Sequence, residues 1–246
     1  MKNIIPLSII LIITLTACSR GVNSSEMLVV QPTIYPSQSI QEYFPLKQGA
    51  YWVYQGNVKW TTPNSADVVE GEITWKMEVK QVFRRHNIVG YEMLGAPWDL
   101  AWYEKGKEPS RYGIIQAGGK FYITSLDAIW RLSDETDDLR ALVNENEIFL
   151  DIPLIQGKKF CDTLSITRED SMYCWVVGDA TQTDASSIKG IESSTTLMEF
   201  PVYMSTLPDF SMIQFIQGVG ISRYVYSHHG TVSEVDVRLV EYHAGE

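Results

Sequence analysis

The stretch Ile73-Thr74-Trp75-Lys76-Met77-Glu78-Val79 alternates apolar side chains with polar ones. Successive side chains of an extended chain point to opposite sides, so the apolar residues would share one face and the polar residues the other. The stretch Val235-Asp236-Val237-Arg238-Leu239 repeats this pattern near the end of the chain. Such alternation is typical of antiparallel strands that have one face on a core and the other in solvent.

Short runs of strand-forming residues recur along the chain, with Gly, Pro, Asn or Asp between them. Residues 227–230 are expected to form the hairpin turn before the last strand, with Gly230 supplying a positive φ. The spacing predicts a mainly β fold whose antiparallel strands form a strongly curved sheet, a sandwich or a partly open barrel. The further predicted strands are residues 51–55, 88–94, 100–104, 112–116, 120–125, 128–132, 164–167, 173–177, 194–200 and 221–226.

One short helix is expected over residues 134–144. The run Asp134-Glu135-Thr136-Asp137-Asp138 places acids at the helix start, where the helix dipole favours them, and Leu139, Leu142 and Val143 follow at helical spacing. The run lacks the Gly and the final Glu of an EF-hand loop, so a solvated helix start is favoured over a calcium site.

The turn sequence Pro45-Leu46-Lys47-Gln48-Gly49 has an echo in Pro153-Leu154-Ile155-Gln156-Gly157, and an aromatic residue follows each within three positions. A Pro and then a Gly before an aromatic run are typical of a turn that begins a strand. The echo is either a chance match or the mark of two related β units in one body.

The composition limits the class of protein. The chain has 246 residues, of which 45% are hydrophobic, so it can bury a core. Thirty acidic and twenty basic residues give a net charge of −10. This balance argues against a nucleic-acid partner and against a polybasic contact with anionic lipid, because both require clustered Lys and Arg.

Residues 1–17 have the parts of a signal peptide: Lys2 near the start, a mostly apolar run over residues 4–15, and small residues at the end. The run is shorter than the about 20 residues that a membrane-spanning helix needs. Leu15-Thr16-Ala17-Cys18 resembles the lipobox of bacterial lipoproteins, which implies that Cys18 begins the mature chain and carries acyl chains. The alternative is an ordinary signal peptide with a chance cysteine.

Residues 18–41 are rich in Ser, Gln and Pro and are expected to form a flexible tether to a single body over residues 42–246. About 20 flexible residues reach roughly 25 Å, enough for the body to stand off the lipid headgroups. The opening Tyr43-Phe44-Pro45-Leu46-Lys47-Gln48-Gly49-Ala50-Tyr51-Trp52-Val53-Tyr54 and the late Gly218-Val219-Gly220-Ile221 resemble a loose group of uncharacterised exported bacterial proteins. That resemblance supports the limits of the body and implies no activity.

Cys161 and Cys174 remain if Cys18 is lipidated, and an even pair in an exported protein should oxidise to a disulfide. Two free buried thiols are the alternative. The Cys-x-x-Cys spacing of a redox pair is absent, and neither a His nor a third thiol lies nearby in sequence to complete a metal site.

Catalytic and cofactor signatures are missing from the sequence. There is no Gly-x-Ser-x-Gly elbow or phosphate-binding Gly-rich loop, and Gly218-Val219-Gly220 lacks the third Gly of a dinucleotide loop. The pair His228-His229 falls in the predicted turn, where adjacent residues point apart, so we expect no metal site. We therefore expect no catalytic residue, cofactor or metal. The carboxylate pairs Glu70/Glu72 and Glu145/Glu147 would matter only in a cleft that raises one pKa.

An aromatic cluster is the best candidate for binding. Trp98, Trp102 and Tyr103 lie in a predicted loop-rich segment, where aromatic rings can stack on sugars or contact a partner protein. Trp98 is the first choice among them, because it follows Pro97 in an expected loop. The alternative is that these side chains belong to the core.

Three functions are compatible with these features. The first is a non-enzymatic lipoprotein, anchored by its lipid on the periplasmic or cell-surface side of a bacterial membrane, that acts as a binding, scaffold or assembly module. Its partner would be an envelope protein, a glycan or a lipid. The second is a carrier of a lipophilic molecule in an apolar groove of the curved sheet. The third is an extracytoplasmic hydrolase that uses a carboxylate pair.

Overall fold

The structure, a computed structural model, describes residues 43–62, 67–192 and 196–246. The predicted signal peptide (residues 1–17), the tether (residues 18–41) and Cys18 lie outside the described residues. Within the described ranges, no helix is long and apolar enough to cross a membrane.

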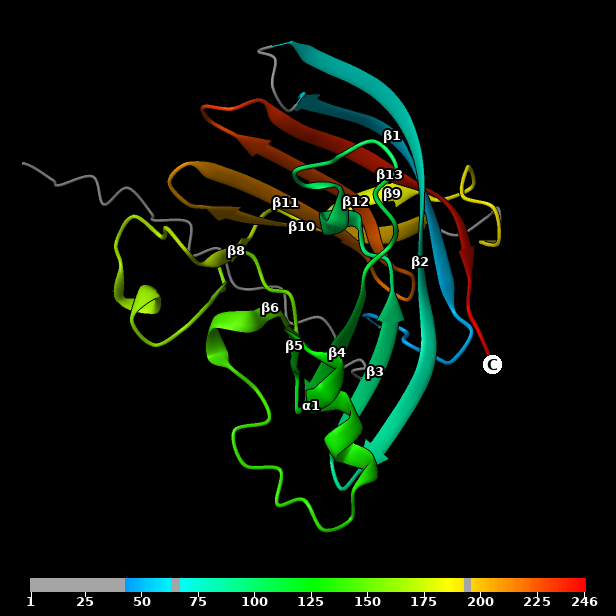
Figure 1. The fold of residues 1–246 in the computed structure, drawn as a ribbon, viewed down its shortest axis with the longest axis vertical. Coiled ribbons are helices and arrows are strands. Elements are labelled where there is room, and N and C mark those ends of the chain that lie inside the picture. The colour runs from blue at the N-terminus through cyan, green and yellow to red at the C-terminus, as the bar shows by residue number, and fades with distance from the viewer. Residues whose placement is uncertain (1–42, 63–66, 193–195) are drawn as a thin grey trace, which may run out of the picture. The chain divides into compact units, whose positions relative to one another are not determined.

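The described residues form one antiparallel sheet in the order β6-β5-β4-β3-β2-β1-β13-β12-β11-β10-β8-β7, with β9 beside β10 (Figure 1). One short α-helix, α1 (Leu126–Trp130), and four short 3₁₀ helices lie in the connections: η2 (Pro97–Leu100), η3 (Arg131–Ser133), η4 (Glu145–Glu147) and η5 (Ser165–Thr167). The strands are β1 (Tyr51–Thr61), β2 (Val68–Arg85), β3 (Ile88–Leu94), β4 (Arg111–Ala117), β5 (Lys120–Thr124), β6 (Ile148–Asp151), β7 (Lys159–Phe160), β8 (Trp175–Val177), β9 (Thr181–Asp184), β10 (Thr196–Ser205), β11 (Asp209–Ile216), β12 (Gly220–His228) and β13 (Ser233–His243).

The sheet is made of two meanders that join where β1 pairs with β13. Strands β1 to β6 form one meander, strands β7 to β13 form the other, and β6 and β7 lie at the two ends of the hydrogen-bonded order. The sheet curves until these ends approach, which makes it nearly closed and barrel-like with one seam. This confirms the predicted mainly β, antiparallel and strongly curved fold with one short helix.

Strand β2 shows how the alternating pattern builds this curvature. Trp75, Met77 and Val79 are buried, whereas the polar residues between them are exposed or half-buried, as predicted. The register shifts between Val79 and Gln81, and such a bulge bends a strand. The first part of β2 therefore pairs with β1 and the last part with β3.

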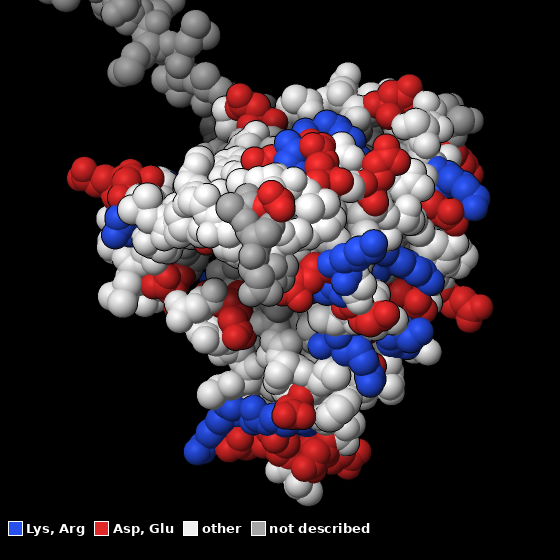
Figure 2. All heavy atoms as spheres, turned by 45° about the horizontal axis from the view of Figure 1, so that its top comes forward, with Lys and Arg blue, Asp and Glu red and all other residues white. Residues whose placement is uncertain are grey.

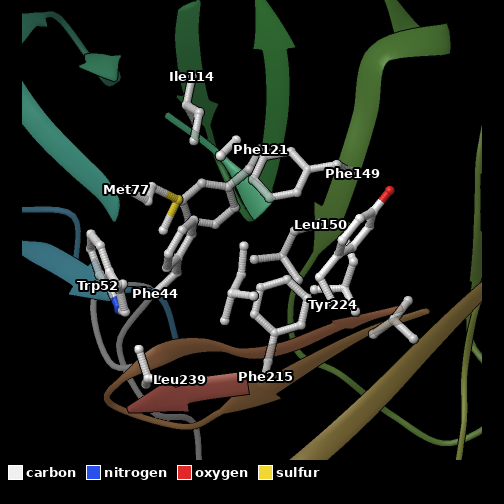
Figure 3. Close-up of a cluster of buried hydrophobic side chains, with 14 of the residues drawn as sticks. Phe44, Trp52, Met77, Ile114, Phe121, Phe149, Leu150, Phe215, Tyr224 and Leu239 are labelled. Carbon is white, nitrogen blue, oxygen red and sulfur yellow. The ribbon is translucent and has the colours of Figure 1, made fainter. Parts of the chain in front are cut away.

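The concave side of the sheet is filled by aromatic and aliphatic side chains (Figure 3). Phe44 lies at the centre, with its ring between 5.7 and 6.3 Å from the rings of Trp52, Phe121, Phe149 and Phe215. The buried indole of Trp52 is satisfied, because its Nε1 donates to the carbonyl oxygen of Val219 at 2.6 Å. The segment that precedes β1 thus supplies Phe44, the residue at the centre of the core.

The two echoed turns have the same hydrogen bonds. Gly49 N–H donates to the Val79 carbonyl at 2.9 Å, and Val79 N–H donates to the Ala50 carbonyl at 2.9 Å. In the second turn Gly157 N–H donates to the Val177 carbonyl at 2.8 Å, and Val177 N–H donates to the Lys158 carbonyl at 3.0 Å. Each turn precedes the first strand of one meander, an arrangement that two related β units would have; the echo stays a prediction.

The predicted helix over residues 134–144 is wrong, because this segment is an irregular loop. Three of its aspartates accept hydrogen bonds from backbone N–H groups two residues later, at 2.6–3.0 Å. From β2, Arg85 donates to carbonyls of the same loop, those of Asp134, Glu135 and Asp137. These bonds use the backbone groups that a helix would pair with one another.

The short helix, α1, instead occupies the place where a strand over residues 128–132 is predicted. Ser125 Oγ caps its first turn by accepting a backbone N–H at 3.3 Å. Ile129 on the buried side of α1 fits against the sheet only because β4 presents Gly113, where an added Cβ would lie 2.3 Å from Ile129 Cγ1. The predicted strand is therefore replaced by a helix that depends on a glycine in a neighbouring strand.

Two other predicted strands, residues 100–104 and 164–167, are also wrong. The first is a turn in which Trp102 has a φ of +55°, outside the β region, and the second forms η5. Strands β6, β7, β9 and β11 are absent from the predictions. In β11 the outward Phe210 and Met212 obscure the alternation, because both faces carry apolar residues.

Candidate functional site at the loop end of the sheet

Several connections of the sheet meet at one end, which we call the loop end; it lies toward the upper left of Figure 1. Backbone hydrogen bonds join neighbouring connections there. Thr61 N–H donates to the Val232 carbonyl at 3.1 Å, and His229 N–H donates to the Pro208 carbonyl at 3.0 Å. On the other side of the β10–β11 turn, Tyr173 N–H donates to the Ser205 carbonyl at 2.9 Å.

Trp102 reaches this end from the β3–β4 loop, which crosses to the β12–β13 turn. Its backbone N–H donates to Ser233 Oγ at 2.9 Å, and this bond holds the residue in its left-handed conformation. Its ring lies edge-on to the ring of His228, with centroids 4.5 Å apart, yet the residue remains 47% exposed. An aromatic side chain is thus held in place while much of its surface faces solvent.

His228 is itself held by a polar network beneath Trp102. His228 Nδ1 lies 2.8 Å from Asp209 Oδ1, and the Tyr226 hydroxyl donates to the same oxygen at 2.7 Å. The hydrogen bond to His228, with a smaller contribution from Tyr226, keeps the pKa of Asp209 below its ordinary value. Burial, and then the hydrogen bond to Asp209, raises the pKa of Tyr226. The network therefore fixes the imidazole that supports Trp102.

The three aromatic residues predicted to bind do not lie together. Trp98 is half-buried, and its ring packs 5.7 Å from Tyr112 and 5.8 Å from Phe149 at the edge of the core. Tyr103 is half-buried and packs edge-on against Trp60 at 5.1 Å. Trp98 and Tyr103 thus pack against other rings, and Trp102 is the most exposed of the three. Whether any of them binds a partner stays a prediction.

Exposed apolar side chains gather at the loop end. Nine large apolar residues are exposed in the described part of the chain, and two of them, Trp130 and Ile155, lie elsewhere. The seven at the loop end, which we call the apolar tips, are Val68, Trp102, Leu164, Ile166, Tyr173, Tyr203 and Leu207. Large exposed apolar patches mark sites of interaction with proteins, ligands or membranes, so these tips are the strongest candidate for a contact surface.

The predicted disulfide is present in the structure between Cys161 and Cys174. The two cysteines flank the paired strands β7 and β8, because Phe160 lies opposite Trp175. The closed loop between them carries three of the apolar tips, namely Leu164, Ile166 and Tyr173. The disulfide therefore closes a connection that carries three of the seven apolar tips.

The first predicted carboxylate pair, Glu70 and Glu72, lies in β2. Glu70 lines a shallow hollow of about 260 Å³ on the outer face of the sheet, together with Glu234, Asp236 and Lys59. Lys59 lies 3.7 Å from Glu70 and 3.3 Å from Glu234, and a hydrogen bond from Arg223 lowers the pKa of Asp236. Acids and bases are also interspersed on the face shown in Figure 2. A catalytic acid needs a raised pKa, whereas the pKa of Asp236 in this hollow is lowered.

The other carboxylate pair, Glu145 and Glu147, is exposed in η4. Among residues 43–62, 67–192 and 196–246, no three His, Cys, Asp or Glu side chains come together in a way that could hold a metal ion. Within the same ranges, the His228 imidazole is hydrogen-bonded to Asp209 and its ring packs against Trp102. This arrangement holds the imidazole against an aromatic side chain.

Sequence reasoning missed most of the loop-end residues. Asp209 and His228 meet because they are direct partners in the β11–β12 register, and β11 carries no clear alternation in the sequence. Leu207 and Leu164 lie in connections, where an apolar residue gives no signal of its exposure. The sequence predicts a solvated turn at His228, whereas its ring packs against Trp102.

Comparisons with known proteins give the following results. No family model matches the chain, and no curated protein matches it. Among solved structures, a protein described as exported, with a YmcC-like fold, from Bacteroides fragilis NCTC 9343 is similar with a TM-score of 0.34 and 12% identity, over 82% of this chain and 98% of that one. A protein described as a lipoprotein from Parabacteroides distasonis ATCC 8503 is similar with a TM-score of 0.37 and 11% identity, over 84% of this chain and all of that one. At these values we transfer no function from either protein to this chain.

Proposed function

We propose that this protein is a membrane-anchored extracytoplasmic lipoprotein that works by contact, as a binding, scaffold or assembly module, and not by catalysis. In this proposal Cys18 carries the acyl chains, residues 18–41 form the tether, and the loop end is the contact surface. Trp102 is its central residue, because it is exposed and yet held in place by Ser233 and His228.

The observation that carries the proposal is the contrast between the inside and the outside of the sheet. Phe44 and the rings around it fill the concave side, which is where a carried lipid would need space. Seven of the nine exposed large apolar residues of the described chain instead lie at one end of the outer surface. Surface contact fits this distribution better than enclosure of a ligand.

The proposed anchor is tested by metabolic labelling with a clickable fatty acid. The full chain is expressed in a bacterium, and the label on the wild type is compared with the label on a Cys18→Ser variant. We expect the label on the wild type and none on the variant. An unlabelled wild-type chain would contradict the anchor, and a labelled variant would move it to another residue.

The contact surface is tested by site-specific photo-cross-linking in intact cells. A benzophenone amino acid replaces Trp102 in one strain and Trp130 in a control strain; the two tryptophans are 47% and 45% exposed. We expect adducts with an envelope protein, glycan or lipid at position 102 and few at position 130. Equal adduct yields at the two positions would contradict a contact surface at the loop end.

A further inference from the structure

We propose that the partner of the apolar tips is the zwitterionic phospholipid surface to which the chain is tethered. This inference rests on the proposed function, because it requires the acyl anchor at Cys18. The tether length alone allows the body to stand off the headgroups. In this inference the loop end of the body lies on the headgroups.

The two most exposed tips lie on neighbouring connections of the loop end. Leu164 is 82% exposed in the disulfide-closed loop, and Leu207 is 78% exposed in the β10–β11 turn. The hydrogen bond from Tyr173 N–H to the Ser205 carbonyl joins these two connections at their bases. Separate apolar tips on neighbouring loops can each enter the headgroup boundary, where apolar side chains gain free energy by leaving water.

The backbone beside Leu164 is suited to that environment. Asp162 Oδ1 accepts hydrogen bonds from the N–H groups of Leu164 at 2.8 Å and Ser165 at 3.0 Å. Ile166 N–H donates to the Asp162 carbonyl at 3.1 Å, and Thr167 Oγ1 donates to the Leu164 carbonyl at 2.9 Å. Backbone polar groups that are paired within the loop lose little when water is displaced.

The charges select the class of lipid. The protein has a net charge of −10, and an anionic bilayer would repel it. Within the disulfide loop, Arg168 is paired with Asp170 through two hydrogen bonds at 2.6 and 2.9 Å, which partly neutralises the loop. Contact therefore has to come from apolar burial against neutral, zwitterionic headgroups.

The length of chain between anchor and body keeps this contact within reach. The described body begins at Tyr43, 25 residues after Cys18. A flexible segment of that length has a root-mean-square reach of roughly 25–30 Å. Phe44 packs beside Gly220, at the end of β12 away from His228, so the tether also has to reach back along the sheet. Tethering still raises the effective concentration of the tips at the lipid surface.

Hydroxyl-radical footprinting of the full, lipidated chain on vesicles of phosphatidylcholine and phosphatidylethanolamine tests the inference. The chain offers two matched pairs: Trp102 and Trp130, 47% and 45% exposed, and Ile166 and Ile155, 42% and 43% exposed. Each pair has one residue type and similar exposure, so its members should oxidise alike in water. On vesicles we expect oxidation of Trp102 and Ile166 to fall several-fold below that of Trp130 and Ile155.

Variants show which side chains make the contact. In a Leu164→Ser, Leu207→Ser double variant, Trp102 and Ile166 should return toward the oxidation of their matched residues. Serine replaces exposed side chains here, so we expect the fold to be retained. A Val68→Ser variant, which removes a tip that is 53% exposed, should have a smaller effect because the other tips remain. A double variant that leaves the protection unchanged would contradict the assignment.

The outcomes separate this inference from the proposed function. A chain that floats with the vesicles but oxidises equally within each pair overturns the lipid contact and leaves the anchor in place. A chain that does not float overturns both. Protection that grows only as more chains are loaded per vesicle assigns the tips to a second copy of this chain, and it also overturns the lipid contact.

Discussion

Trp98 and Trp102 show how one loop can carry a core residue and an exposed one. The ring of Trp98 turns inward against Tyr112 and Phe149, whereas Trp102 adopts a positive φ and lies on His228 at the surface. Both tryptophans lie in a segment with the sequence of a loop, so the sequence does not predict which of them is buried. The difference arises from contacts with strands that are remote along the chain.

The two tryptophans should therefore respond differently to removal. We expect Trp98→Ala to lower the free energy of unfolding by about 2–3 kcal/mol, because it leaves a cavity beside Phe149. We expect Trp102→Ala to change it by about 0.5 kcal/mol or less, as exposed substitutions usually do. Urea unfolding followed by circular dichroism measures both. Equal losses would contradict the distinction between core and surface.

Buried tyrosines give the fold a dependence on alkaline pH. Burial raises the pKa of Tyr91 and of Tyr242 to about 12 in each case. The folded state thus favours the neutral phenol, so the stability that these groups contribute is fully present below pH 10 and is lost as pH rises through about 12.

Ultraviolet titration of tyrosinate checks this prediction. Absorbance of the folded protein should still be rising at pH 12, whereas the chain in denaturant should complete its titration near pH 10. If the folded protein finishes at the lower pH, these two hydroxyl groups are not buried as described.

At the scale of elements, the prediction succeeded where one face of a strand is apolar and the other polar. This holds for β2 and β13, whose buried and exposed residues alternate as the sequence indicates. It failed where backbone groups are bound by a distant side chain, as in the loop that Arg85 organises, and where a remote glycine admits a helix, as at α1. Those causes are tertiary contacts, and a local pattern does not contain them.

Arg85 should be required for the loop over residues 134–140. Its guanidinium reaches several carbonyls at once, and a lysine ammonium is too compact to do so. We expect Arg85→Lys to destabilise this loop locally by about 1–2 kcal/mol. Hydrogen exchange of the amides of Leu139 and Arg140 should become faster. The neighbouring, exposed Arg84→Lys is the control, and equal exchange in both variants would contradict the role of Arg85.

The disulfide should stabilise the second meander. Closing a loop of about 15 residues is worth about 3 kcal/mol in the chain-entropy model. A Cys161→Ser, Cys174→Ser double variant should therefore have a free energy of unfolding that is lower by about 3 kcal/mol, and it should unfold at a lower urea concentration. Reduced wild type should behave in the same way. Unfolding that is unaffected by reduction would show that the bond does not constrain the unfolded chain.

At the scale of the molecule, the filled interior and the apolar tips are the observations that support the proposed surface function. Features that depend on residues close together in the chain can be predicted from the sequence. These are the lipobox resemblance, the tether composition and the cysteine pair. The candidate contact surface cannot be predicted from the sequence, because Asp209, His228 and Trp102 are brought together by strand register and by a crossing loop. Exposure of Leu164 and Leu207 likewise becomes visible only in the fold.

The central claim is that an acylated chain rests its loop end on the bilayer that holds it. Neutron reflectometry of the full lipidated protein on a supported phosphatidylcholine bilayer measures this directly, because it resolves protein, water and headgroups along the normal. We predict a protein layer in contact with the headgroups, without a water layer between them. A hydrated gap of roughly 25 Å, the reach of the tether, would contradict the claim.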